Sequence, residues 1–205
     1  MQELVKDYLW VDYNKQIDNN KLYQTCLDIE QCLMQKFPPP NTPAYGCMSS
    51  FYPEEYNVFN FASPELYDLY TYISTSVKKY LVTNEKYYIR SWVNIFQTEK
   101  FIGWHDHWPS MFNVFHGFYC VNTEGVNPSF TEYQIPNHHE LKITSKDGLL
   151  VFGKSDGDKH RSSPWMNSER ARVTIAFDVI PEYNVYIANK KEEKFKNTFS
   201  LVPLI

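Results

Sequence analysis

From residue 86 to residue 180 the chain has the pattern of short β-strands separated by turns. β-branched and aromatic residues, which favour strands, concentrate in five runs. Asp147-Gly148 and Asp156-Gly157 are dipeptides typical of the turns between strands. The pattern predicts a β core built as a pair of sheets or a barrel. The expected strands are Tyr87–Gln97, Phe112–Asn122, Leu141–Thr144, Leu149–Gly153 and Arg172–Ile180.

The first 85 residues are predicted to be helical, with loops. Asp18 or Asn19 can cap a helix that Pro38-Pro39-Pro40 ends, and Ser63-Pro64-Glu65 is a typical start for a second helix. Residues 38–64 otherwise form an irregular connection. Both helices carry apolar stripes that are most simply packing faces, so the fold class is α+β and mainly β, with flanking N-terminal helices. The stripes are Leu22, Cys26, Ile29, Leu33 and Phe37, then Leu66, Leu69, Ile73 and Val77.

Length and composition place the chain among soluble single-domain proteins. The 205 residues suit one domain, organised as a helical flank (1–85), a β core (86–180) and a tail (181–205). The formal net charge of −4 suggests no nucleic-acid-binding surface. We find no secretory signal and no apolar stretch of membrane-spanning length, so we expect a cytoplasmic protein that does not bind membranes. The cysteines form no C-x-x-C pair, and we expect free thiols at Cys26, Cys32, Cys47 and Cys120.

Histidines supply the first chemical signal. His105-Asp106-His107 places two imidazoles two residues apart, where an extended chain turns both side chains to the same side. A third ligand from a distant strand would complete a facial set of three with open positions, and His160 is the best candidate. His116 is a rival ligand, whereas His138 and His139 are expected at the surface. A pair of nearby histidines alone is equally compatible with a surface or hydrogen-bonded pair.

A strand after His160 supplies the second signal. Arg172, Thr174 and Ala176 share one face of this strand, and the other face is apolar. An arginine that faces inward is costly unless it is paired, and a carboxylate satisfies it in a bidentate manner. A structural ion pair with one of the chain's own 24 acids is the plain alternative. Arg170 competes for the same role but lies at the expected exposed start of the strand.

Together these segments resemble the 2-oxoglutarate/iron(II)-dependent oxygenases, most of all their small prolyl-hydroxylase-like bacterial and phage branch. The resemblance covers residues 86–180, and its segments share the family's order. They are Trp92-Val93-Asn94, His105-Asp106-His107, Gly117-Phe118-Tyr119-Cys120-Val121-Asn122, Asp147-Gly148-Leu149-Leu150-Val151-Phe152, His160 and Arg172-Val173-Thr174.

The resemblance implies a double-stranded β-helix (jelly-roll, cupin-like) core and a set of roles. His105 and His160 would bind Fe(II), and Arg172 with Thr174 would bind the far carboxylate of 2-oxoglutarate. Tyr119 would add a second hydrogen bond to that carboxylate, and Asn94 or Trp92 would line the pocket. The implied partners are 2-oxoglutarate, O2 and a primary substrate that is hydroxylated with release of succinate and CO2.

One position departs from the family. The residue two after the first histidine is usually a carboxylate, but here it is His107. Either the metal site has three histidines, His105, His107 and His160, or Asp106 or His116 completes it. A neutral ligand would leave the site one unit more positive.

Two other classes of function compete with the oxygenase. A cupin-like metalloenzyme without 2-oxoglutarate would use the histidines but would give Arg172 no special role. A non-enzymatic β-sandwich module would present Trp104, Trp108 and Trp165 as stacking platforms for sugar and would bind no metal.

Overall fold

A computed structural model describes residues 8–36, 56–81, 84–125, 127–136, 140–156, 158–167, 169–185 and 201–205. Within these residues the fold is mainly β, with two long helices. The helices are α2 (Asn19–Lys36) and α3 (Pro64–Leu81), with short 3-10 turns η2 (Val58–Asn60) and η3 (Ser110–Phe112). The strands are β1 (Leu9–Tyr13), β2 (Tyr87–Phe96), β3 (Phe115–Asn122), β4 (Phe130–Gln134), β5 (Leu141–Thr144), β6 (Leu149–Lys154), β7 (Lys159–Ser162), β8 (Arg172–Pro181) and β9 (Val202–Pro203).

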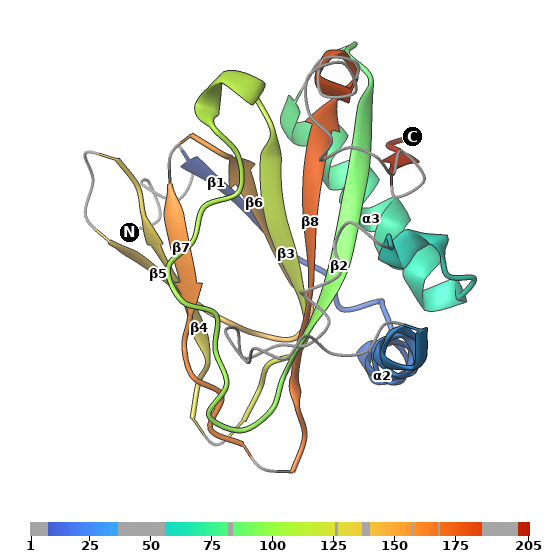
Figure 1. Ribbon diagram of the computed structural model, residues 1–205, viewed down its shortest axis with the longest axis vertical. Coiled ribbons are helices and arrows are strands. Elements are labelled where there is room, and N and C mark those ends of the chain that lie inside the picture. Colours follow the sequence, from blue (N-terminus) through green and yellow to red (C-terminus); the bar gives the residue numbers. More distant parts are fainter. Residues whose placement is uncertain are drawn as a thin grey trace.

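The strands form two antiparallel sheets that face each other (Figure 1). The larger sheet has the order β1-β6-β3-β8-β2-β9, and the smaller has the order β5-β4-β7. Successive strands move between the sheets: β2 and β3 lie in the larger, β4 and β5 in the smaller, β6 in the larger, β7 in the smaller and β8 in the larger. Residues distant in sequence therefore meet in the space between the sheets.

The two helices cover the outer face of the larger sheet, opposite the smaller sheet (Figure 1). Strand β8 shows how one strand serves both sides. Val173, Ile175, Phe177 and Val179 are fully buried in the cluster that includes the helix stripes. The alternate residues, among them Arg172 and Asp178, face the smaller sheet, as the alternation in the sequence predicted.

Both helices begin where the sequence predicted. The Oδ1 atom of Asp18 accepts the amide of Lys21, and the Oγ atom of Ser63 lies 3.5 Å from the amide of Leu66, so both residues act as N-caps. The predicted stripes are the buried faces. Phe37 and most of the irregular connection lie outside the described residues. No helix among the described residues combines the length and apolar character needed to cross a bilayer.

The strand predictions need additions in the middle and at both ends of the chain. Strands β4 and β7 were not among the predicted runs, and Phe112, the predicted start of a strand, lies in η3, with β3 beginning at Phe115. The first 85 residues are more than a helical flank, because β1 adds an edge strand that pairs with β6 from Leu9↔Gly153 to Tyr13↔Leu149. Near the other end, β9 pairs with β2. The turn before β6 contains Gly148 at φ +88°, where an added Cβ would lie 2.2 Å from the carbonyl oxygen of Asn14, so only glycine fits.

The cysteines that the structure describes are free thiols: Cys26 and Cys120 are buried, and Cys32 is exposed. The fourth, Cys47, lies outside the described residues.

Candidate metal centre

Four histidines from three parts of the chain gather between the two sheets. His105 and His107 come from the segment after β2, His116 from β3 and His160 from β7. The His160 ring centroid lies 4.3 Å from that of His105, 5.0 Å from that of His107 and 4.9 Å from that of His116. The sequence singled out all four residues, while His138 and His139 lie outside the described residues.

A β-bridge holds the first and last of these histidines together. The amide of His105 donates to the carbonyl of His160 at 3.0 Å, and the reverse bond measures 2.9 Å. This backbone pairing aligns the two side chains on one side of the smaller sheet. The ring nitrogens of His105, His107 and His160 include one atom each within 4.8 Å of the others, so the predicted set could hold one ion.

Hydrogen bonds assign the free nitrogens of His105 and His107. Nδ1 of His105 lies 2.9 Å from the carbonyl of Gly103, and Nδ1 of His107 lies 2.8 Å from Oδ1 of Asp178. A carbonyl and a carboxylate only accept, so each Nδ1 carries a proton, and in a neutral ring Nε2 then keeps its lone pair. Nδ1 of His116 and Nδ1 of His160 are buried without a hydrogen-bond partner among the described residues. This donor set suits a divalent transition metal.

A second possible ligand set contains a carboxylate that the sequence analysis missed. Asp158, His116 and His160 also bring one ligand atom each within 4.8 Å of the others, and all three are buried. Oδ2 of Asp158 lies 3.2 Å from Nε2 of His116, an electrostatic contact without hydrogen-bond geometry. Asp158 stands two residues before His160, so the alternation rule that joined His105 to His107 could have found it. Asp106 is exposed, and it does not belong to either set.

Burial and the neighbouring histidines lower the pKa of His160 and of His105, which favours the neutral forms of these two rings. Burial lowers the pKa of His160 well below its usual value, and the neighbouring histidines lower it further. Burial likewise lowers the pKa of His105, followed by the effect of His107. Burial would raise the pKa of Asp158, but the contact with His116 lowers it below its usual value. Neutral imidazoles beside an ionised carboxylate are the protonation states that bind metals.

Arg172 lies further along the same space, at the start of β8. Its side chain is 1% exposed, with Nη2 3.2 Å from Oγ of Ser145 and the guanidinium 5.2 Å from the centre of the Phe96 ring. Thr174 follows on the same face, and Nδ2 of Asn94 lies 3.5 Å from its Oγ1. The structure thus places Arg172, Thr174 and Asn94 between the sheets with the histidines.

Tyr119 is the exception, and we correct that prediction. Its ring lies on the helix side of the larger sheet, packs against Tyr72, and donates from its hydroxyl to Oδ1 of Asn19. A tyrosine that does face the space between the sheets is Tyr133 of β4. Its ring lies 5.3 Å from that of His160, and its buried hydroxyl has no hydrogen-bond partner among the described residues.

Three residues of the larger sheet that face the smaller sheet are slightly more exposed than their immediate neighbours in the strands. Trp92 and Phe118 are each 8% exposed, and Ala176 is 7% exposed. By contrast, their strand neighbours on the helix side, Val93 and Phe177, are 0% exposed.

The three tryptophans of the β-sandwich alternative differ in how far they are buried. Trp165 is 1% exposed, and its Nε1 donates to the carbonyl of Arg170 in the core. Trp108 donates from Nε1 to Asp178. Trp165 is therefore unavailable as a stacking platform, whereas Trp104 and Trp108 are half-buried.

Comparisons with known proteins support the resemblance to the 2-oxoglutarate/iron(II)-dependent oxygenases at the level of the fold. No protein-family model matches the sequence, and no curated protein matches it. Solved structures do match. A prolyl hydroxylase from Trichoplax adhaerens, in complex with a hypoxia inducible factor peptide fragment, is 13% identical, with 91% of this chain and 90% of that chain covered and a TM-score of 0.61.

Two further structures show the same likeness. A Pseudomonas putida prolyl-4-hydroxylase is 10% identical, covers 87% of this chain and 95% of its own, and has a TM-score of 0.58. The non-heme alpha ketoglutarate dependent epimerase SnoN from nogalamycin biosynthesis is 10% identical, with coverage of 86% and 79% and the same TM-score. The chain therefore has the fold of the 2-oxoglutarate/iron(II) oxygenases, and the resemblance is confirmed at that level.

Proposed function

We propose that the chain is a 2-oxoglutarate- and iron(II)-dependent oxygenase that hydroxylates an organic substrate. The observation that carries the proposal is the shared interior face, which has a histidine cluster near one end and the buried Arg172 at the other. Many folds hold a metal with histidines, but a cation set apart from them on the same face is what a dicarboxylate cosubstrate needs. The alternation of strands between the two sheets supports a double-stranded β-helix core.

His105, His107 and His160 are the proposed iron ligands. Three protein ligands would leave other coordination positions of the ion for small molecules. When bound, iron, 2-oxoglutarate and oxygen supply the oxidising chemistry, with release of succinate and CO2. The protein's own part is to hold these groups in place and to limit the access of water.

Arg172, Thr174 and Asn94 are the proposed cosubstrate residues. The guanidinium would take the far carboxylate of 2-oxoglutarate, and Thr174 would donate to it. The hydroxyl of Tyr133 is the interior donor that replaces Tyr119 in this role. A buried hydroxyl without a partner costs about 1–3 kcal/mol, so a bound acceptor beside Tyr133 is favourable.

Two measurements test the function. Calorimetric titration of 2-oxoglutarate into the iron-loaded protein under nitrogen should show saturable binding that the iron-free protein shows weakly or not at all. Admission of oxygen should then release succinate. Binding of iron without any binding of 2-oxoglutarate would contradict the oxygenase and favour the cupin-like metalloenzyme.

A further inference from the structure

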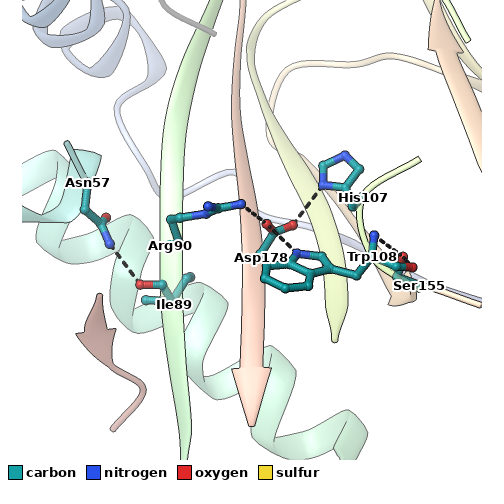
Figure 2. Close-up of polar contacts among 7 residues, drawn as sticks. All are labelled: Asn57, Ile89, Arg90, His107, Trp108, Ser155 and Asp178. Carbon is teal, nitrogen blue, oxygen red and sulfur yellow. Dashed lines mark hydrogen bonds and ion pairs between the residues drawn. The ribbon is translucent and has the colours of Figure 1, made fainter. Parts of the chain in front are cut away.

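Asp178 is the most heavily hydrogen-bonded carboxylate near the histidine cluster, and it is not itself a candidate ligand. It lies near the end of β8 and is fully buried. Its Oδ1 accepts from Nδ1 of His107 at 2.8 Å, and its Oδ2 accepts from Nη2 of Arg90 at 2.8 Å and from Nε1 of Trp108 at 2.9 Å (Figure 2). Three donors from two segments, Arg90 of β2 and the consecutive residues His107 and Trp108, thus hold one carboxylate in a fixed orientation.

The donors are themselves fixed. The Arg90 guanidinium lies 5.6 Å from the centre of the Trp92 ring and 5.7 Å from that of Trp108, so it is held between two aromatic faces. The amide of Trp108 donates to Oγ of Ser155, and that hydroxyl donates back to the Trp108 carbonyl (Figure 2). A buried carboxylate held this firmly does more than fill the core, because it determines what its third partner, His107, can do.

We propose that Asp178 is a positioning residue that fixes His107 in the tautomer with the proton on Nδ1, and so presents Nε2 to the metal ion. The inference rests on the proposed metal site and names a residue that acts through a ligand. A carboxylate behind a metal-binding imidazole orients the ring and makes its free nitrogen a stronger donor. The site would thereby still contain a carboxylate at this position, but Asp178 would hydrogen-bond to the ligand His107 and would not itself bind the metal.

The matched variant is Asp178→Asn, because it keeps the shape and changes only the hydrogen-bonding pattern. Arg90 and Trp108 can only donate, so they require the amide oxygen of the asparagine. Its NH2 group then faces Nδ1 of His107, where two donors would meet. The proton on His107 is expected to move to Nε2, which removes the lone pair from the metal side.

Two readouts separate this role from a merely structural one. With 15N-labelled histidine, long-range 1H–15N correlation spectra of the metal-free protein report which ring nitrogen carries the proton, and His107→Gln identifies the His107 signals. We expect Nδ1–H in the wild type and Nε2–H in Asp178→Asn. Anaerobic titration with Co(II), followed by its visible absorption, should show an affinity loss of about 10- to 100-fold in Asp178→Asn. Asp106→Asn, a change at the exposed neighbouring carboxylate, should alter neither.

Three results would overturn the inference. The first is an Nε2–H tautomer in the wild-type protein, a measurement that holds even if the variant fails to fold. The second is unchanged Co(II) affinity in a folded Asp178→Asn protein. The third is Co(II) binding that survives His107→Gln but is lost in His116→Gln and Asp158→Asn, since the ion would then use the other ligand set. A wild type that binds Co(II) with the expected tautomer but never binds 2-oxoglutarate would contradict the oxygenase and leave this inference standing.

Discussion

Replacing Arg172 with alanine should weaken 2-oxoglutarate binding while leaving the metal in place. The arginine is 1% exposed and lies between the sheets, against Ser145 and the face of Phe96. In such a dry site a charge-assisted pair is strong, and its loss leaves a buried carboxylate without its cation. Removal of one partner of a buried pair costs about 2–4 kcal/mol. At about 1.4 kcal/mol for each factor of ten, the dissociation constant should rise roughly 30- to 700-fold.

Calorimetry of 2-oxoglutarate into the iron-loaded proteins, under nitrogen, measures this change directly. The control is Arg170→Ala, because Arg170 is exposed and lies over the ring of Tyr23, away from the interior. That variant should bind 2-oxoglutarate like the wild type, and both variants should retain their iron affinity, since neither arginine is a ligand. Equal dissociation constants for the wild type and Arg172→Ala would refute the reasoning and remove Arg172 from the site.

Three further predictions concern the interior and its titration. Tyr133→Phe should weaken 2-oxoglutarate binding by about 0.5–1.5 kcal/mol in the same calorimetric assay, whereas Tyr119→Phe should leave the affinity unchanged and lower only the melting temperature. In the metal-free protein, His160 binds its proton more weakly when folded than when unfolded, so stability falls as pH drops below about 6.5. Burial raises the pKa of Glu30 to about 7, which gives the opposite trend, so denaturant titrations should compare the wild type with His160→Gln. Between about pH 6.5 and about pH 5 the wild type should lose more stability than the variant, by at most about 1.4 kcal/mol per pH unit. Ala176→Leu should reduce 2-oxoglutarate affinity by at least about tenfold and leave Co(II) binding unchanged, because the larger side chain fills space between the histidine cluster and Arg172. Unchanged 2-oxoglutarate affinity would mean that the cosubstrate binds elsewhere.

The parts of this structure that follow local rules could be predicted from the sequence. Caps and helical periodicity located α2 and α3, and alternation put Arg172 and Thr174 on one face of β8. The same rule could have corrected the tyrosine. His116 and Tyr119 are three residues apart on β3, an odd number, so their side chains must leave opposite faces of the sheet.

The remaining features depend on pairings between distant segments. Strand β1 is recognisable only through its partner β6, about 140 residues later, because five residues of mixed character carry no clear period. The bond between His107 and Asp178 spans 71 residues and depends on how β8 lies against the loop after β2. No local sequence pattern predicts such a contact. The sequence therefore showed His107 in place of the usual carboxylate but did not show that Asp178 hydrogen-bonds to it.

Strand β8 explains how the site can depart from the usual pattern of the 2-oxoglutarate/iron(II) oxygenases at one end without disturbing the other. Arg172 and Asp178 lie on the same face of β8, six residues apart, which corresponds to about 20 Å of strand. Thr174 and Ala176, with small side chains, lie between them. The back of the strand is fully buried in the core cluster that includes the helix stripes, so its backbone sets this spacing. A substitution at Arg172 should therefore change cosubstrate affinity alone, and one at Asp178 should change metal affinity through His107. If each substitution instead changed both the 2-oxoglutarate affinity and the metal affinity, Arg172 and Asp178 would not act independently at the two ends of one rigid strand.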